Sequence, residues 1–264
     1  MTATIFDIKE FAIRDGPGGR TTVFFKGCPL RCRWCHNPEG LSPLPQLMVK
    51  EAKCTRCGLC RRPCGHEECR PFGRCLHVCP NGCISVSGRT WSAPELAARL
   101  LRDRPLWERT GGGVSFSGGE PLLQWEFLME LIPLLEGANT ALETSGFAPA
   151  DVFRRVIGKM DYVMMDVKLA DEKAHRAWTG VSNRQILENL RVLQESGVPH
   201  ELRTPLIPGV TDTPENLEAV RVLVGDSPWK TLPYNTLAGA KYPMLGMTYP
   251  MDAPAADSTD QERI

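Results

Sequence analysis

Cysteine is the residue type in this sequence that points most directly to chemistry. The chain holds 11 cysteines in 264 residues, and all of them lie between Cys28 and Cys83. A disulfide framework staples a small secreted chain along its length, and an odd number of cysteines would leave one thiol over. Because these cysteines are confined to one stretch of a large chain, the sequence predicts metal binding rather than disulfides.

The first cysteine cluster has the spacing C-x3-C-x2-C and consists of Cys28, Cys32 and Cys35. Thiolates are the ligands of iron–sulfur clusters, so three thiolates on one short loop can hold three irons of a [4Fe–4S] cluster. The fourth iron then has no protein ligand and is open to a substrate or cofactor. A zinc site with His36 as its fourth ligand is the alternative that the spacing alone leaves open.

The second cluster places eight cysteines in residues 54–83, a stretch too poor in apolar residues to form much of a core. It begins with the spacing C-x2-C-x2-C-x3-C, as in bacterial ferredoxins, where the fourth cysteine serves the other cluster. The second half is irregular, because it lacks a C-x2-C start. Zinc in place of iron, or loss of the second cluster, are the alternatives. We predict two auxiliary [4Fe–4S] clusters, one on Cys54, Cys57, Cys60 and Cys79 and the other on Cys64, Cys69, Cys75 and Cys83.

The rest of the chain alternates between strand and helix patterns, which must position the first cluster. Apolar runs predict strands at 21–25, 114–117, 140–143, 162–167, 202–207 and 231–237. Amphipathic patterns predict helices at 93–102, 124–135, 149–157, 171–178, 183–196 and 214–224, the last capped by Thr213. About six β/α units are fewer than the eight of a closed barrel. The sequence therefore predicts an α/β fold: a partial (β/α)6 barrel at 1–47 and 89–250, an inserted ferredoxin-like domain at 48–88, and a loose tail at 251–264.

The motifs around the first cluster resemble a known family. The C-x3-C-x2-C loop with Trp34 before its last cysteine resembles the radical S-adenosylmethionine (SAM) superfamily. The segments 15–20 (DGPGGR) and 32–39 (CRWCHNPE) resemble the activating enzymes of glycyl radical enzymes, such as pyruvate formate-lyase activating enzyme. The resemblance implies reductive cleavage of SAM to a 5′-deoxyadenosyl radical, which abstracts a Cα hydrogen from a glycine of a partner enzyme.

The same resemblance assigns roles residue by residue. The segment 117–121 (SGGEP) matches an element that holds the SAM ammonium, and Glu143 with Thr144 stands where the family usually has Asp-Thr. Asn235 replaces a usual histidine. The implied SAM-binding residues are Trp34, His36, Gly118, Gly119, Glu120, Glu143, Thr144, Asp166, Lys168, Arg203 and Asn235. A monovalent cation is implied beside Glu143, Thr144, Met164 and Asp166.

Composition limits the partners and the compartment. Lys plus Arg and Asp plus Glu number 31 each, which argues against bulk attraction to nucleic acid or membranes. No apolar run is long enough for a transmembrane helix, and the first ten residues do not read as a signal peptide, so we expect a cytoplasmic protein. Residues 48–88 carry seven Lys and Arg against three Glu, a net charge of +4. This charge suits an acidic reductant or target, and offsetting the anionic clusters or forming a solvated face are the alternatives.

We expect a glycyl radical enzyme as protein substrate and a flavodoxin or ferredoxin-type protein as reductant. Two other functions stay open: a radical SAM enzyme that modifies another peptide or small molecule, and an electron-transfer iron–sulfur protein. Extra cysteines after the barrel would favour the first of these, and none follow Cys83. The electron-transfer hypothesis does not explain the first cysteine loop together with the SGGEP segment.

Overall fold

A computed structural model of the chain describes residues 1–251. Its main sheet has eight strands in the order β10-β9-β8-β7-β6-β2-β1-β5. Neighbouring strands are parallel from β2 to β10. The parallel strands are β2 (Arg20–Phe25), β6 (Gly113–Gly118), β7 (Asn139–Thr144), β8 (Tyr162–Asp166), β9 (His200–Leu206) and β10 (Trp229–Pro233). Six parallel strands in an open sheet confirm the predicted partial barrel.

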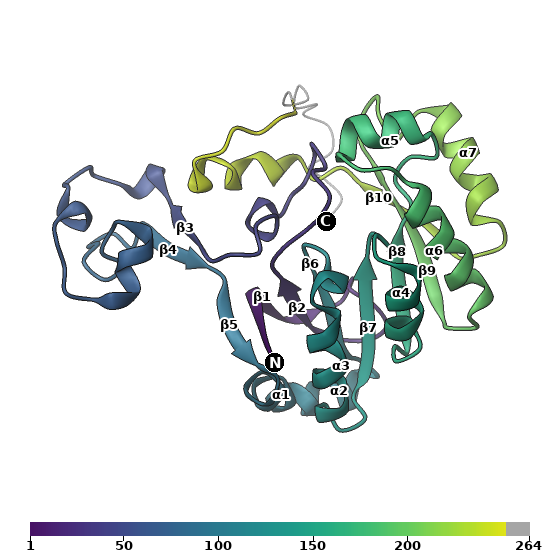
Figure 1. The fold of residues 1–264 in the computed structure, drawn as a ribbon, viewed down its shortest axis with the longest axis horizontal. Helices are drawn as coiled ribbons and strands as arrows, with labels where there is room; N and C mark the ends of the chain where they lie inside the picture. The colour runs from purple at the N-terminus through teal and green to yellow at the C-terminus, as the bar shows by residue number, and fades with distance from the viewer. Residues whose placement is uncertain (252–264) are drawn as a thin grey trace.

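Two antiparallel strands extend the sheet beyond β2, and the sequence analysis did not predict them. β1 (Thr2–Ala12) pairs with β2 on one side and with β5 (Arg89–Ser92) on the other. β1 has mostly half-exposed or exposed positions, so it lacks the continuous apolar run of a strand buried on both faces. The two strands bring the N-terminus and the segment after the insertion to the same edge of the sheet (Figure 1).

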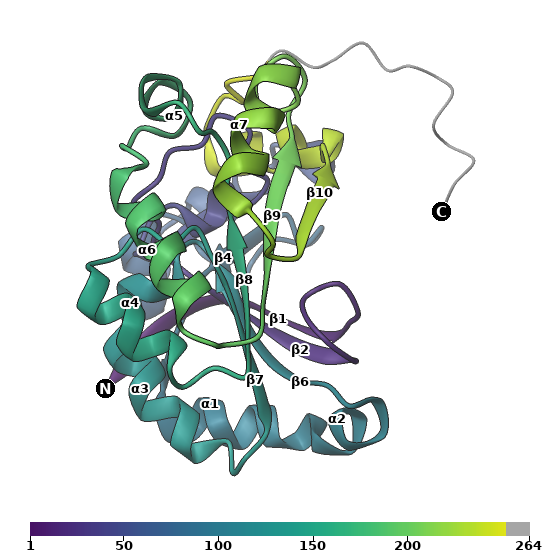
Figure 2. The same ribbon diagram turned by 90° about the vertical axis from the view of Figure 1, so that its right-hand side faces the viewer.

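Helices cover one face of the sheet, as Figure 2 shows. They are α1 (Ala93–Leu100), α2 (Arg104–Thr110), α3 (Trp125–Leu134), α4 (Ala150–Ile157), α5 (Glu172–Thr179), α6 (Arg184–Glu195) and α7 (Pro214–Val224). Local signals set several of their starts. The Ser92 side chain forms a capping box with Glu95 at α1, and Thr213 accepts a hydrogen bond from the Asn216 amide at α7, as predicted. None of the helices within residues 1–251 is long and apolar enough to cross a membrane.

The alternation of side chains along each strand separates a core from a polar inner face. Leu142, Val163, Met165 and Leu202 are fully buried in the core formed with the helices. Their neighbours in sequence, which include Glu143 and Asp166, therefore point to the opposite face. A row of charged and polar side chains at the ends of adjacent strands is the result.

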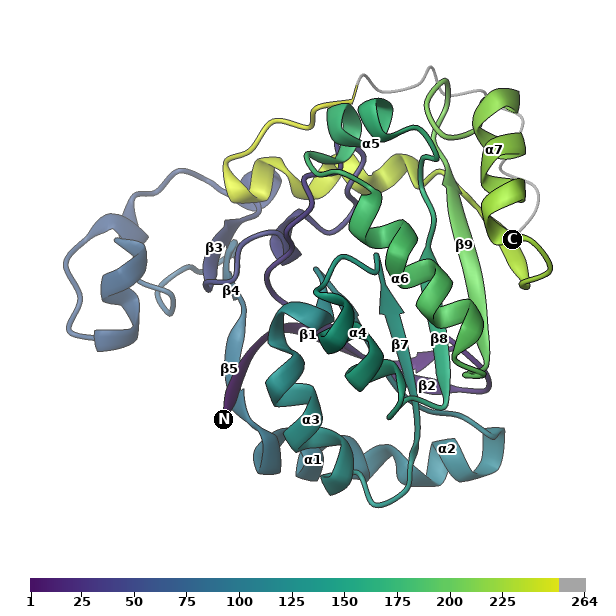
Figure 3. The same cartoon turned by 45° about the vertical axis from the view of Figure 1, so that its right-hand side comes forward.

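The insertion lies to one side of the barrel (Figures 1 and 3). It leaves and returns through an antiparallel pair, β3 (Gln46–Val49) and β4 (Ile84–Ser87). Between them, the regular structure consists of short 3₁₀ segments: η2 (Glu51–Lys53), η3 (Leu59–Arg61) and η4 (Glu67–Phe72). The buried residues of residues 50–83 are Cys69, Cys75 and Cys83. A segment with so small an apolar core gains little stability from hydrophobic burial.

Several predicted boundaries differ from the structure. The strand predicted at 231–237 is β10, which ends at Pro233 because the Asn235 side chain caps the following 3₁₀ segment, η7 (Thr236–Lys241). The helix predicted at 93–102 ends at Leu100, and a 3₁₀ turn at 101–103 separates it from α2, which has Pro105 in its first turn. The remaining short 3₁₀ segments are η1 (Pro38–Gly40), η5 (Leu101–Asp103), η6 (Pro121–Gln124) and η8 (Pro243–Leu245). The predicted loose tail, apart from Met251, lies outside the described residues.

Candidate radical SAM active site

A cavity of about 510 Å³ opens on the polar inner face, at the carboxyl ends of the parallel strands. This is the end at which enzymes built from parallel β/α units carry their sites. Ten of the residues predicted from the sequence line it together: Cys28, Cys32, Trp34, Cys35, His36, Gly118, Gly119, Glu143, Thr144 and Asp166. Lys168 and Asn235 complete the predicted part of the lining.

The loop with the three cysteines follows β2 and is anchored mainly through its backbone. The Arg31 amide donates to the Thr179 carbonyl at 2.6 Å, and the Arg33 amide donates to the Trp178 carbonyl at 3.1 Å. These two bonds tie the loop to the end of α5. On its other side, the Tyr242 hydroxyl donates to the Cys35 carbonyl at 2.9 Å. The cysteines therefore project from a loop that two distant parts of the chain hold in place.

Trp34 fixes the middle of this loop by packing. Its side chain is buried in a small apolar cluster with Leu169, Ile207 and Val210, and its ring centre lies 6.4 Å from that of Trp178. The family resemblance implies that Trp34 binds SAM. The structure gives it a place in the wall of the cavity and a second role in holding the loop.

The three thiols are half-buried in the wall of the cavity. Burial raises the pKa of Cys28 and Cys32 to about 12 and that of Cys35 to about 11. Burial and the charge of Lys241 lower the pKa of His36, so its ring is neutral near pH 7. The ligand atoms of these thiols and His36 are spread further apart than the 4.8 Å within which a single metal ion gathers its ligands. That spread suits a four-iron cluster better than the single zinc ion of the alternative hypothesis.

The two glycines after β6 allow a close approach between backbones. Gly118 has φ of +120°, and a Cβ there would lie 2.3 Å from the Phe25 amide nitrogen. A Cβ on Gly119 would lie 2.2 Å from the Gly27 carbonyl oxygen. The Gly119 amide instead donates to the Phe25 carbonyl at 2.8 Å. Glycine is required at both positions to seat the start of the cysteine loop, in addition to any contact with a cofactor.

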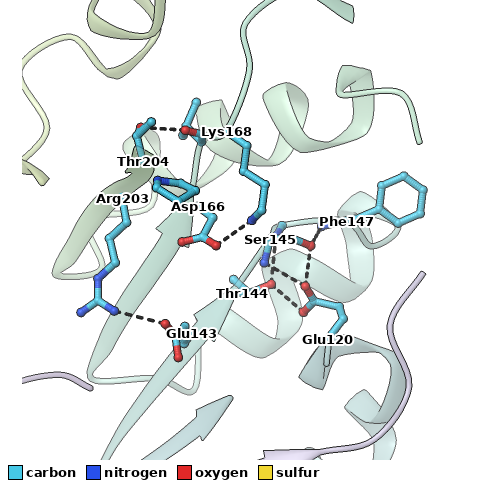
Figure 4. Close-up of polar contacts among 12 residues, drawn as sticks. Glu120, Glu143, Thr144, Ser145, Phe147, Asp166, Lys168, Arg203 and Thr204 are labelled. Atoms are coloured by element: carbon cyan, nitrogen blue, oxygen red, sulfur yellow. Dashed lines mark hydrogen bonds and ion pairs between the residues drawn. The ribbon is translucent and has the colours of Figure 1, made fainter. Parts of the chain in front are cut away.

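Glu120 does not line the cavity but lies fully buried behind it. Its carboxylate accepts hydrogen bonds from the Thr144 hydroxyl at 2.6 Å, from the Ser145 hydroxyl at 2.6 Å and from the Ser145 amide at 2.8 Å (Figure 4). It also accepts a bond from the Leu122 amide. Burial raises the pKa of Glu120, and the bonds from Ser145 and Thr144 oppose that shift. In this structure Glu120 holds the end of β7 through Thr144 and Ser145, and its predicted contact with SAM stays a prediction.

Two ion pairs occupy the inner face in Figure 4. Lys168 Nζ lies 2.6 Å from Asp166 Oδ2 at the end of β8, and Arg203 Nη1 lies 3.2 Å from Glu143 Oε1. Burial alone would lower the pKa of Lys168, but Asp166 and Cys32 outweigh it and raise that pKa. Burial and Asp166 raise the pKa of Glu143, against the effect of Arg203. The strand ends therefore present paired charges to the cavity.

The residues predicted around a monovalent cation come together as neighbours, because Glu143 pairs in register with Met164 across β7 and β8. Glu143 and Asp166 already have Arg203 and Lys168 as partners. Arg203 itself lies behind the cavity, where it also contacts Glu201 at 2.7 Å. In this structure Arg203 pairs with Glu143, and its predicted contact with the cofactor stays a prediction.

Several lining residues were missed by the sequence analysis. Ser117, Ser145 and Lys241 line the cavity beside predicted residues. Ser117 and Ser145 stand at or just after the ends of β6 and β7, so the rule that strand ends carry the site could have found them. Lys241 lies 2.5 Å from Glu39. The two residues are more than 200 positions apart in the chain, so no local sequence pattern predicts their contact.

The auxiliary cysteines form two groups, and their membership differs from the predicted one. Cys54, Cys57, Cys60 and Cys79 line one cavity, as predicted, but Cys83 lines the same cavity. Of the set predicted with Cys83, the other three, Cys64, Cys69 and Cys75, gather around His66 instead. The structure thus brings together seven of the eight predicted auxiliary ligands in their two groups and separates Cys83 from its predicted group.

Comparisons with known proteins agree with this architecture. Residues 22–219 match the model of the radical SAM superfamily. The chain is 38% identical to choline trimethylamine-lyase activating enzyme from Oleidesulfovibrio alaskensis, over 99% of this chain and 93% of that relative. It is 37% identical to indoleacetate decarboxylase activating enzyme from Tractidigestivibacter scatoligenes, over 94% of this chain and 88% of that relative.

A solved structure supports the fold alone. SuiB of Streptococcus suis, in complex with precursor peptide SuiA, is 13% identical, with a TM-score of 0.52 over 83% of this chain and 39% of that chain. The family match covers most of the sequence and the geometry of the site agrees with it, so the fold and site define a radical SAM enzyme. The chain belongs to the activating enzymes of glycyl radical enzymes within that superfamily, which confirms the predicted family.

Proposed function

We propose that this chain binds SAM in the cavity beside Cys28, Cys32 and Cys35 and generates a glycyl radical on a partner enzyme. The observation that carries the proposal is the meeting of three half-buried thiols with paired charges at the ends of β7 and β8 in one cavity. Three thiolates leave one iron of a four-iron cluster without a protein ligand. The relatives described above are named as activating enzymes of different glycyl radical enzymes, which supports a glycyl radical enzyme as the class of partner.

A bound, reduced [4Fe–4S] cluster would supply one electron that cleaves the S–C5′ bond of SAM, giving methionine and a radical that takes a hydrogen atom from the glycine Cα. The chain's own residues hold the reactants and exclude water. Lys168 would face the SAM carboxylate, while Asp166 keeps that lysine in place. Gly118, Gly119 and Asn235 offer backbone and amide groups to the rest of SAM. Glu120 and Arg203 hold the strand ends from behind.

Phe6, Asp7 and Lys9 of β1 also line the cavity, so it reaches beyond the cysteine loop to the antiparallel edge of the sheet. A cavity that extends past the SAM-binding residues leaves room for a loop of the partner that carries the target glycine. An open sheet suits a peptide segment better than a closed barrel does.

The proposal extends to the accessory parts. Cys54, Cys57, Cys60 and Cys79 would hold an auxiliary [4Fe–4S] cluster, and the basic insertion would receive electrons from an acidic flavodoxin or ferredoxin-type protein in the cytoplasm. The second predicted cluster requires Cys83 beside Cys64, and the position of Cys83 near Cys79 does not support it. A monovalent cation at Glu143, Thr144, Met164 and Asp166 would have to compete with the ion pairs to Arg203 and Lys168.

The test is anaerobic cleavage of SAM. The reconstituted full chain is reduced and mixed with SAM and a glycyl radical enzyme, beginning with choline trimethylamine-lyase, and 5′-deoxyadenosine and the glycyl radical signal are quantified. We expect both products from the wild-type chain and neither from Cys32→Ala. The variant should lose about four irons and keep the auxiliary iron, which controls for folding. Equal cleavage by Cys32→Ala would reject the site, and cleavage without a radical on any such partner would reject the proposed substrate.

A further inference from the structure

The insertion contains a second kind of metal site, which is distinct from an iron–sulfur cluster. One ligand atom from each of Cys64, His66, Cys69 and Cys75 lies within 4.8 Å of all the others. His66 Nδ1 and Cys75 Sγ are 3.8 Å apart. Within residues 1–251, no other set of three or more cysteine, histidine and acidic side chains has its ligand atoms all within this distance. The three active-site cysteines, which are the cluster ligands expected for this family, are not gathered so closely.

The distances favour one metal ion. In a tetrahedral zinc site, Zn–S bonds of about 2.3 Å and Zn–N bonds of about 2.0 Å place the ligand atoms about 3.5–3.8 Å from one another. A [4Fe–4S] cluster separates its ligands further, because each thiolate is bonded to a different iron and projects away from the cluster. A limit of 4.8 Å, with one pair at 3.8 Å, therefore fits a mononuclear site.

The local structure holds these residues in that geometry. His66 precedes the 3₁₀ segment η4 (Glu67–Phe72), and its carbonyl accepts the Cys69 amide at 3.2 Å. The Cys69 sulfur accepts the Leu76 amide at 3.3 Å, and the Cys75 amide donates to the Cys60 carbonyl at 2.8 Å. Hydrogen bonds of this kind orient ligands around a metal. Cys69 and Cys75 are buried, in a segment with almost no other core.

The sequence explains why a fourth thiolate is missing. The ferredoxin spacing C-x2-C-x2-C-x3-C, counted back from Cys79 through Cys75, reaches Phe72 and then Cys69. Phe72 thus stands where the middle cysteine of the second half would be. Cys83 does not replace it, because its amide donates to the Cys79 sulfur at 3.3 Å and it lines the cavity of the other group. His66 is the side chain that completes four ligands.

We propose that Cys64, His66, Cys69 and Cys75 bind one Zn²⁺ ion as a structural Cys3His site. The chain would then carry a single auxiliary [4Fe–4S] cluster, and the zinc ion would fold the part of the insertion around it without taking part in electron transfer. This inference goes beyond the proposed function and does not depend on which reaction the barrel performs.

The test measures metals in the full-length chain, expressed with iron and zinc both available and purified without oxygen. We expect about one zinc and, after reconstitution with iron and sulfide, about eight irons per chain. X-ray absorption at the zinc edge should show three sulfur ligands and one nitrogen ligand. His66→Ala should lower zinc affinity at least tenfold in a chelator competition, whereas Cys83→Ser should leave it unchanged.

His66→Cys controls for folding, because a thiolate in place of the imidazole should retain zinc with four sulfur ligands. About twelve irons and no zinc in the wild-type chain would overturn the proposal. So would a zinc content that Cys83→Ser abolishes and His66→Ala leaves intact. This test does not measure cleavage of SAM. A failure of the zinc proposal can therefore be told apart from a failure of the proposed function.

Discussion

The ammonium of Lys168 lies 2.6 Å from the carboxylate of Asp166, two residues earlier in the chain, and both groups line the cavity beside Cys32. The Lys168 side chain is 9% exposed, so this pair is largely removed from water. Removal of one partner from such a pair leaves the other charge without compensation. The pair sets the charge of the cavity wall next to the cysteine loop.

Replacement of this lysine should therefore weaken SAM binding. We expect Lys168→Met to raise the Kd of SAM at least tenfold, which is about 1.4 kcal/mol, because the unpaired Asp166 would repel the SAM carboxylate. Equilibrium binding of SAM to the reconstituted protein measures the effect. Lys173→Met, on the exposed side of α5, serves as the control and should leave the Kd unchanged. An unchanged Kd in Lys168→Met would contradict the assigned role.

Glu120 should act on the stability of the site through Thr144 and Ser145. In Glu120→Gln, the side-chain NH₂ cannot accept the bonds that the carboxylate accepts, so we expect the free energy of unfolding to fall by about 1–3 kcal/mol. Anaerobic denaturant titration checks this value. Glu126→Gln, exposed on α3, should change it by less than about 0.5 kcal/mol. A loss of SAM affinity with no loss of stability would instead favour direct contact between Glu120 and SAM.

The pair formed by Arg203 and Glu143 should be energetically coupled. Arg203→Met leaves Glu143 without its cation, and Glu143→Gln leaves Arg203 with fewer acceptors, so the double variant should lose less than the sum of the single losses. We expect a coupling energy of about 1–3 kcal/mol in a double-mutant cycle of unfolding free energies. Arg191→Met, exposed on α6, is the control for loss of an arginine. Additive effects of the two substitutions would show that the pair contributes nothing.

Lys26 gives the folded chain a specific pH dependence. Its side chain is fully buried, donates to the Glu39 carbonyl and to Gln46, and burial lowers its pKa from 10.5 to about 8. Between pH 8 and 10.5 the unfolded chain keeps a proton that the folded chain has lost, so stability contributed by this group rises with pH.

The comparison that isolates this effect is between the wild-type chain and Lys26→Met. The unfolding free energy of the wild type relative to the variant should rise by up to about 1.4 kcal/mol per pH unit in that window and be flat below it. Unfolding titrations at several pH values measure the difference. A difference that is constant from pH 7 to 10.5 would show that Lys26 keeps its ordinary pKa in the fold.

Features that depend on local chemistry followed from the sequence. The spacing of Cys28, Cys32 and Cys35 is a property of one short loop, and the cap at Thr213 involves residues three positions apart. The runs of buried residues in β2, β6, β7 and β8 stand out in the sequence. β1 and β5 escaped prediction because an edge of the sheet imposes no such pattern. The fold class and the first metal centre could therefore be predicted without coordinates.

The tertiary structure decided which distant side chains meet. Arg203 and Glu143 are 60 residues apart and become neighbours through the register of β7, β8 and β9 in the sheet. Glu120 meets the Thr144 and Ser145 hydroxyls, which lie 24 and 25 residues later in the chain, because β6 and β7 are neighbours in the sheet. Cysteine spacing names the candidate ligands of the insertion, but the folding of η4 brings His66, and not Cys83, to Cys64, Cys69 and Cys75. The sequence identifies the candidate metal ligands of the insertion. Which of them share one metal site depends on distances that the packing of the folded chain determines.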